Sequence, residues 1–414
     1  MALSRRGMIT ASMATLLSAC VSGGTRSGEN SGGSSTVYLA EPDAGYDAWV
    51  AAFRDRAAKR GISGTTLGAA FRNAGFLPGV IEKDRNQTEF TRTLEDYLAI
   101  AASEERVSLG RAQLRQQAGV LAAIEGRYGV EPHVVAAVWG LESFFGTRRG
   151  DVPVISALST LAYEGRRGAF FEGQLVAALR ILQNGDVSAD RMTGSWAGAM
   201  GHTQFIPTSY LEYAVDFTGD GRRDIWSDDP SDALASTAAY LSRSGWTRGV
   251  PWGAEVRLPQ GFGPGLLGRG KGKSATGWTD LGVTLADGGR LPANASGSII
   301  APNGLGGPAF LLTSNFNVIL RYNNAENYAI GIGHLSDRLA GGSAIRADFG
   351  ADVAGMKIGD RQELQRRLTA AGFDTEGSDG VIGAKTRAAI SAYQASVGLP
   401  VTGEPSLDLL RRLR

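Results

Sequence analysis

A single glutamate within an apolar segment is the residue of this sequence best suited to acid–base chemistry. Glu142 follows Val138 and Trp139 by about one helical turn, and Phe145 comes on the next turn. Such neighbours remove water from the carboxyl group, which disfavours its ionised form, so we expect its pKa to be raised. A carboxylic acid that keeps its proton near neutral pH is the general acid that glycosidic cleavage needs. On position alone, a solvated glutamate at a helix rim is the alternative.

Two further segments carry polar groups suited to a sugar rather than to a phosphate. Residues 195–210 combine small residues with the uncharged hydrogen-bonding side chains of Ser195 and Gln204. Residues 320–329 are rich in Tyr and Asn, whose ring faces and amides suit the CH groups and hydroxyls of a sugar. Taken singly, the first segment also fits a tightly packed helix pair and the second a capped helix start.

Mostly helical elements must position these segments. Apolar periodicity predicts helices over 134–145, 170–184, 198–213 (kinked or split by Pro207), 232–245 and 324–339, and one long or two shorter helices over 91–127. From 246 to 316 the helical period fades, and short strands are expected at 255–258 and 298–300. The expected fold class is mainly α with a small β-containing insertion.

The composition excludes several classes of protein. The 414 residues are 43% hydrophobic, which is ample for folded cores and excludes a wholly disordered chain. A formal charge of +1 gives no basic balance that would call for a nucleic acid, so no nucleic-acid partner is expected. One Cys excludes an internal disulfide framework and a cysteine-rich metal site.

Taken together and in order, the motifs resemble the lytic murein transglycosylase B family. The segments that carry the resemblance are Trp139–Gly146, Ser156–Leu161, Arg166–Arg167, Ser195–Tyr210, Ala214–Gly221 and Arg321–Asn323. The resemblance implies a lysozyme-like catalytic domain that cuts the MurNAc–GlcNAc β-1,4 bond of peptidoglycan, as part of cell-wall remodelling and turnover.

By match to that family's motif, Glu142 is the catalytic acid and then the base. It would protonate the leaving oxygen and then accept the C6 hydroxyl proton of the same MurNAc, whose oxygen attacks its own anomeric carbon. The product is a 1,6-anhydroMurNAc end, and no water is consumed. One carboxylate therefore suffices, whereas ordinary glycosidases use two. Asp151, Glu164 and Glu172 are nearby in sequence, but none lies in a comparably apolar helix.

The resemblance also implies which residues contact the glycan. The substrate-binding residues that match are Ser195, Met200, Gln204, Tyr240, Tyr322, Asn323 and Tyr328. Among these, Asn323 is expected to hold the oxocarbenium-like state or the N-acetyl group.

A degenerate calcium loop follows the second segment. Asp216, Thr218, Asp220 and Asp224 occupy loop positions one, three, five and nine of an EF-hand. Position twelve, which should be a bidentate acid, is Ser227. We therefore expect no cofactor to be required and calcium binding to be weak, the alternative being a turn held by Asp side chains.

The N-terminus has the parts of an export signal. A basic start, a short apolar stretch and the sequence Leu17–Cys20, which resembles a bacterial lipobox, predict a lipoprotein signal peptide over 1–19 and lipidation of Cys20. Residues 20–45, rich in Gly and Ser in their first part, are expected to form a flexible tether. The expected location is the periplasm of a Gram-negative bacterium, on the outer membrane through the N-terminal lipid.

The last residues form a separate unit. Glu363–Leu368, Asp379–Thr386 and Tyr393–Gln394 resemble the three-helix peptidoglycan-binding domain. The expected boundaries are 46–340 for the catalytic domain, 341–355 for a linker and 356–414 for the binding domain.

The sequence thus predicts an enzyme that acts on peptidoglycan glycan strands. Two alternatives stay open: a non-catalytic wall-binding lipoprotein and a plain muramidase that hydrolyses the same bond. Cell-wall synthesis or division proteins are candidate partners beside the glycan and the membrane.

Overall fold

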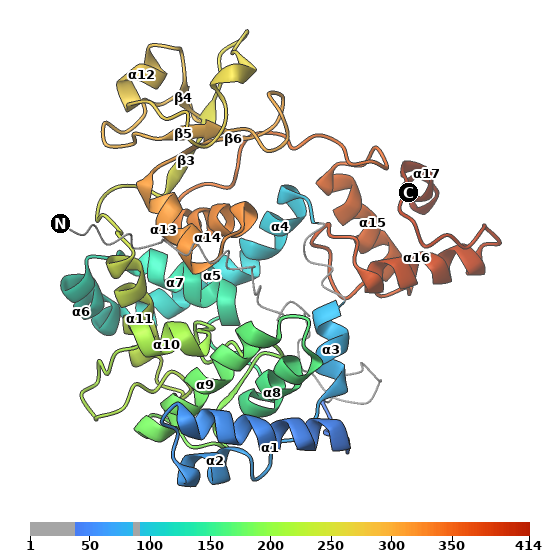
Figure 1. The fold of residues 1–414 in the computed structure, drawn as a ribbon. Coiled ribbons are helices and arrows are strands. Elements are labelled where there is room, and N and C mark those ends of the chain that lie inside the picture. Colours follow the sequence, from blue (N-terminus) through green and yellow to red (C-terminus); the bar gives the residue numbers. More distant parts are fainter. Residues whose placement is uncertain (1–37, 86–91) are drawn as a thin grey trace.

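The computed structural model describes residues 38–85 and 92–414, and its ribbon is mainly helical (Figure 1). The predicted signal peptide over 1–19 and the predicted lipid site at Cys20 lie outside the described residues. The first helix begins at Ala44, two residues before the predicted start of the catalytic domain at residue 46. In the described ranges, none of the helices is both long and apolar enough to cross a bilayer.

The first three helices pack against a helical hairpin, at the bottom of Figure 1. Here the bounds are α1 Ala44–Lys59, α2 Gly64–Ala70, α3 Pro78–Arg85, α8 Val154–Glu164 and α9 Gly168–Asn184. Asp43 caps α1 by accepting a hydrogen bond from the backbone N–H of Tyr46 at 2.7 Å. The Tyr46 hydroxyl in turn lies 2.7 Å from Ser159 Oγ on α8, so the cap and the interface are fixed together.

One buried helix organises the middle of the molecule. Nine of the twelve residues of α7 (Pro132–Ser143) are buried, which explains why its sequence is apolar on every face. It packs against α5, α6, α11 and α14. The bounds of the helices around it are α4 Leu94–Ala101, α5 Glu104–Gln116, α6 Ala118–Tyr128, α10 Pro207–Tyr213, α11 Ser231–Arg243, α13 Ser314–Tyr322 and α14 Glu326–Leu339.

Two antiparallel sheets complete the larger unit. A short pair joins β1 (Val152–Pro153) to β2 (Thr193–Gly194), with Val152 opposite Gly194. The insertion is a four-stranded sheet in the order β4-β3-β6-β5. Its elements are β3 Gly253–Arg257, η2 Pro264–Leu266, α12 Ala275–Thr279, β4 Thr284–Leu285, β5 Ser298–Ile300 and β6 Ala309–Leu312. The predicted mainly α fold with a small β-containing insertion is confirmed, and Trp278 lies at the centre of the insertion's own core.

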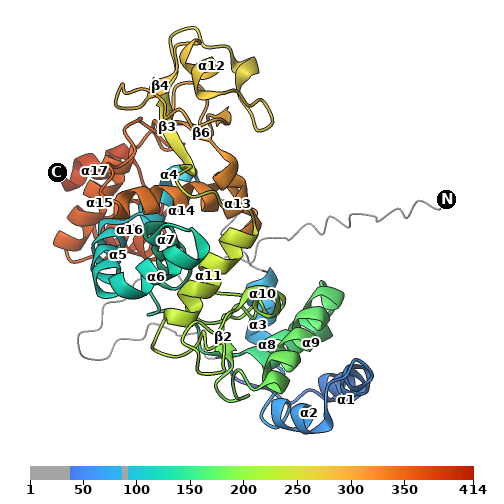
Figure 2. The same cartoon turned by 90° about the vertical axis from the view of Figure 1, so that its left-hand side faces the viewer.

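The C-terminal residues form the predicted three-helix unit. Its helices are α15 Ile358–Ala370, α16 Ala384–Ser396 and α17 Leu407–Leu413. They share a small core that includes Leu364, Leu368 and Ile390. This unit, which we call the C-terminal module, lies beside α4 in both views (Figures 1 and 2).

Two helix predictions were wrong in detail. The segment 91–127 contains three helices, α4, α5 and α6, rather than one or two. Residues 198–206 are not helical, because Gly198, Gly201 and Gln204 have φ values of +82°, +68° and +53°. Only Pro207–Tyr213, where proline occupies the first turn, forms the helix that was expected from residue 198.

The half-buried Asp337 joins the insertion to α14, and its carboxyl group should make the stability of the protein depend on pH. Trp252 Nε1 donates to Asp337 Oδ2 at 2.9 Å, and burial raises the pKa of Asp337 to about 7. Because this pKa exceeds that of the unfolded chain, the contribution of Asp337 is full below about pH 4 and is lost as the pH rises towards 7. Asp337→Asn should remove this dependence, which amounts to no more than about 4 kcal/mol of unfolding free energy. Urea unfolding at pH 4.5 and 7.5 tests it, and equal slopes with pH in both proteins would contradict it.

Candidate active site

Glu142 lies on the last turn of α7, with its side chain enclosed. The residue is 6% exposed, and the hydroxyl of Tyr328 on α14 donates to its Oε1 at 2.6 Å. Burial, and then the charge of Glu142, raise the pKa of Tyr328 well above its ordinary value, so this phenol stays a donor at any physiological pH. The solvated helix rim that the sequence left open is therefore wrong for Glu142.

The turn after Glu142 is strained and held from several sides. Phe144 and Phe145 have φ values of +50° and +57°, a region that costs energy for residues with a side chain. The ring of Phe145 is 5% exposed and lies edge-on to Trp139, with centroids 5.5 Å apart. Packing around this ring thus holds the strained turn that directly follows Glu142.

Gly140 makes room for that ring, which yields a test. A Cβ at Gly140 would lie 2.5 Å from Cζ of Phe145, so Gly140→Ala should cost about 1–3 kcal/mol of unfolding free energy through overpacking. It should also lower activity, because Phe145 must move next to Glu142. Urea unfolding and turnover measure both effects.

Gly126 on α6 is the matched control for this substitution. It is exposed, and no atom lies within 4 Å of its added Cβ. Gly126→Ala should be neutral or stabilise by up to about 1 kcal/mol, as alanine does in a helix. Equal stability of the two alanine variants would contradict the role given to Phe145.

His202 holds two other residues of α7, Trp139 and Ser143, a positioning role that the sequence did not indicate. Trp139 Nε1 donates to its Nδ1 at 3.1 Å, and its Nε2 lies 2.7 Å from the carbonyl oxygen of Ser227. The neutral tautomer with the proton on Nε2 satisfies both contacts, and burial lowers the pKa of His202, which favours that form. The hydroxyl of Ser143, next to Glu142, donates to the His202 carbonyl. Only the folded contacts reveal this role.

An aromatic cluster lies on the other side of Glu142. The ring of Tyr322, on α13, lies 4.8 Å from that of Tyr240 and 5.8 Å from that of Phe205. The Tyr322 hydroxyl donates to the Thr203 carbonyl at 2.6 Å. Burial and then the charge of Glu142 raise the pKa of Tyr322 well above its ordinary value, so this phenol keeps its proton. The structure therefore brings Tyr328 and Tyr322 to Glu142, and Tyr240 packs against Tyr322.

Three enclosed oxygens near this cluster accept no hydrogen bond from the described residues. They are Thr203 Oγ1, Gln204 Oε1 and Asn323 Oδ1, on residues that are 0%, 7% and 9% exposed. The Gln204 amide nitrogen donates to the carbonyls of Arg149 and Gly201 at 3.0 and 2.9 Å, which fixes the orientation of its oxygen. Buried polar atoms normally have partners, so these oxygens are suited to accept from a bound molecule's N–H and O–H groups.

Ser195 and Met200 lie in the turn after β2. Ser195 Oγ accepts from the backbone N–H of Ala199 at 3.1 Å, which leaves its own proton available for a ligand. Met200 forms bridges with Gly194 and Phe205, and its side chain is fully buried. In this structure the Met200 side chain is part of the packing beneath this turn and does not contact solvent.

The three other nearby acids do not join Glu142. Glu164 pairs with Arg85 at 2.9 Å, and Glu172 pairs with Arg56 at 2.8 Å. Asp151 is exposed. Of the acids considered from the sequence, Glu142 is thus the one placed in an apolar setting.

One protein family matches most of the chain. Residues 45–337 match the model of the transglycosylase SLT domain. The chain belongs to this family. Residues 358–413 match a family of peptidoglycan binding domains, so the C-terminal module is of that type.

Solved structures and a curated relative resemble this SLT-domain chain. SltB3 from Pseudomonas aeruginosa in complex with NAG-NAM-pentapeptide is 48% identical, with a TM-score of 0.71, over 89% of this chain and 99% of that one. Slt35 from Escherichia coli in complex with calcium is 26% identical, with a TM-score of 0.61, over 74% of this chain and 97% of that one. The membrane-bound lytic murein transglycosylase B of Escherichia coli K12 is 33% identical over 220 residues, 51% of this chain. The match spans 58% of that relative's length.

The loop after α10 in this SLT domain gathers carboxylates, but not in the predicted set. Oxygens of Asp216, Asp220 and Asp232 lie within 4.8 Å of one another. Asp232, which comes from α11, was missed by the loop spacing. Thr218 Oγ1 instead donates to Asp216, and Asp224 accepts from the backbone N–H groups of Trp226 and Ser227. Three carboxylates suit a hard cation such as calcium, while backbone N–H groups already bond to Asp216 and Asp232.

Proposed function

We propose that this protein is a lytic transglycosylase that cleaves the MurNAc–GlcNAc β-1,4 bond of peptidoglycan and leaves a 1,6-anhydroMurNAc end. The observation that carries the proposal is the enclosed Glu142 carboxyl with Tyr328 as its hydrogen-bond donor, in a wall of aromatic rings and unpartnered oxygens. SltB3, a similar protein, has been solved with NAG-NAM-pentapeptide and with NAG-anhNAM-pentapeptide, the substrate-like and anhydro forms.

In the proposed reaction Glu142 donates one proton and then accepts another. Its carboxyl group first protonates the glycosidic oxygen, and the bond from that oxygen to C1 of MurNAc breaks. The resulting carboxylate, held by the Tyr328 hydroxyl, then accepts the proton of the C6 hydroxyl as O6 bonds to C1. The donated proton leaves with the released GlcNAc hydroxyl, the C6 hydroxyl proton restores the Glu142 carboxyl group, and no water enters. The enclosed wall supports this order because it keeps water from competing with O6.

The residues around Glu142 are proposed to hold the sugar. Asn323 Oδ1 and Gln204 Oε1 would accept from the N-acetyl N–H or from hydroxyls, and Ser195 would donate from its hydroxyl. The ring of Tyr322 offers a face for sugar CH groups. Met200 would shape this wall from beneath.

Mass spectrometry of digested sacculi tests the proposal. The expected products have MurNAc ends that have lost one water relative to a reducing end. Ends that retain that water would indicate a plain muramidase, and undigested sacculi would indicate a wall-binding protein without activity. Either result would overturn the proposal.

The C-terminal module and the N-terminus are proposed to hold the enzyme at its substrate. A peptidoglycan-binding module raises the local concentration of glycan at the catalytic cleft. We further propose a periplasmic location on the outer membrane of a Gram-negative bacterium, with lipid on Cys20 and cell-wall synthesis or division proteins as partners. The curated relative is membrane-bound by name, which supports an envelope location.

Calcium is proposed to stabilise the loop at Asp216, Asp220 and Asp232 without being needed for catalysis. With a Kd on the order of 1 mM, about 10 mM calcium should add about 1.4 kcal/mol of unfolding free energy after treatment with a chelator. Asp220→Asn should abolish that gain, and magnesium should not reproduce it. Thermal or urea unfolding measures the effect. Loss of turnover in the chelator would contradict the proposal.

A further inference from the structure

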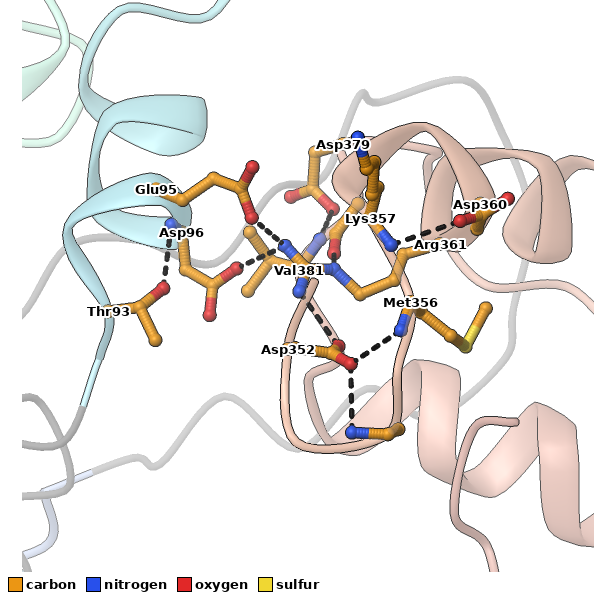
Figure 3. Close-up of polar contacts among 12 residues, drawn as sticks. Thr93, Glu95, Asp96, Asp352, Met356, Lys357, Asp360, Arg361, Asp379 and Val381 are labelled. Carbon is orange, nitrogen blue, oxygen red and sulfur yellow. Dashed lines mark hydrogen bonds and ion pairs between the residues drawn. The ribbon is translucent and has the colours of Figure 1, made fainter. Parts of the chain in front are cut away.

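A buried arginine joins the C-terminal module to the catalytic domain. Arg361 on α15 is 4% exposed and donates to Glu95 Oε2 at 2.6 Å and to Asp96 Oδ1 at 2.9 Å, both on α4 (Figure 3). From within the module it also donates to Asp352 Oδ2 at 2.9 Å and to the Gly380 carbonyl at 2.8 Å. The guanidinium of Arg361 is therefore bonded at the same time to the C-terminal module and to α4 of the catalytic domain.

The contact affects the charges of its two sides differently: burial outweighs the attraction of Arg361 and raises the pKa of Glu95, whereas Arg361 stays charged. Burial alone would lower the pKa of Arg361, but its hydrogen bond to Asp352 and the charges of Asp96 and Glu95 outweigh burial and raise that pKa. The cation therefore persists in the contact. Thr93 caps α4 by accepting from the N–H of Asp96 at 3.1 Å, which fixes the first turn that Arg361 grips.

Hydrogen bonds near both ends of α4 link it to the helices that carry Tyr328 and Glu142. At its N-terminal end, Asn327 Nδ2, next to Tyr328 in α14, donates to the Arg92 carbonyl at 3.5 Å. At its C-terminal end, the side chain of Arg106 bridges the carbonyls of Ile100 and Gly140, so α4 is tied to α7 two residues before Glu142.

The middle of α4 also contacts α14. The ring of Tyr97 lies so close to Gly331 that an added Cβ would be 2.7 Å from its Cε1. Gly331 lies about one helical turn after Tyr328, the residue that donates to Glu142. The position of α4 thus bears directly on the hydrogen bond between Tyr328 and Glu142.

We propose that Arg361 is a positioning residue of the active site: by gripping Glu95 and Asp96, the docked C-terminal module holds α4 against α14 and so keeps Tyr328 on Glu142. The module then contributes to turnover itself and not only to wall binding. This inference rests on the proposed transglycosylase activity.

The test uses the full chain and removes the negative charges on α4 to which Arg361 binds. Glu95→Gln/Asp96→Asn keeps hydrogen-bond acceptors on α4 and leaves Arg361 its partners inside the module. The matched control, Glu376→Gln/Asp408→Asn, removes the same charge from two exposed ion pairs of the module. Arg361→Lys, which keeps the charge but not the fork of donors, is expected to be intermediate.

Three measurements separate positioning from wall binding. With soluble uncrosslinked glycan strands, kcat for anhydro product should fall about 2- to 30-fold in the α4 variant, while sedimentation with sacculi stays unchanged. Proteolysis within 341–357 should become faster. The control variant should match the unsubstituted protein in all three.

The outcomes are distinguishable. An unchanged kcat in the α4 variant, or a loss confined to sacculus binding, would overturn the inference while leaving the proposed function in place. Absence of anhydro product from the unsubstituted protein would instead overturn the proposed function.

Discussion

Glu142→Gln should lower the rate of anhydro product formation by a factor of about 100 to 10,000, because the amide can neither give nor take the proton. The fold should survive. Gln keeps the volume of Glu142, and its Oε1 can still accept from the Tyr328 hydroxyl. Turnover on soluble glycan strands, followed by mass spectrometry of the ends, measures the effect.

The controls for this variant are a fold check and a second glutamate. Sedimentation with sacculi should be unchanged, because the C-terminal module has its own core. Glu212→Gln, on the exposed surface of α10, should leave turnover as it is. If Glu142→Gln kept its turnover, another group would have to supply the proton, and the proposed mechanism would be wrong.

Much of the catalytic helix could be predicted from the sequence, because a helix that is buried on every side must be apolar along its whole length. The segment before Glu142 has that character, and α7 follows it. The helices that carry Tyr240 and Tyr328 were also predicted. Their convergence on Glu142 depends on how α11, α13 and α14 pack, which no local pattern contains.

The parts that the sequence missed depend on backbone conformation or on distant partners. The apolar and small residues of 198–206 fit a helix, yet Gln204 takes a positive φ that only the surrounding contacts make tolerable. His202 and Asp232 have their roles through residues on other elements. Nothing in the local sequence marks Arg361 as buried, because its partners on α4 are 266 and 265 residues away in sequence.

The structure explains how a single carboxyl group could serve both steps. An acid that must give a proton and then accept one needs neither form to be held too strongly. Enclosure in α7 favours the neutral form, and the Tyr328 hydroxyl favours the ionised one. Substitution of Tyr328 should change the balance between these two effects.

Tyr328→Phe should reduce kcat about 10- to 100-fold, the worth of one hydrogen bond to a charged group. Without this donor the Glu142 carboxylate that forms in the first step is less stable, so proton transfer to the leaving oxygen becomes harder. The carboxyl group would also keep its proton to a higher pH, so the alkaline limb of the pH–rate profile should move upward. Rates across the pH range on soluble strands measure both changes.

Tyr210→Phe is the matched control, because it deletes another buried phenol, whose hydroxyl donates elsewhere. The Tyr210 hydroxyl donates to the Arg223 carbonyl, and its residue is fully buried, so the stability loss should be similar, about 1 kcal/mol. Its pH–rate profile should coincide with that of the unsubstituted protein. A profile of Tyr328→Phe that fell in height without moving along the pH axis would mean that Tyr328 only packs against Glu142, and the balance of the two forms would have to come from other groups.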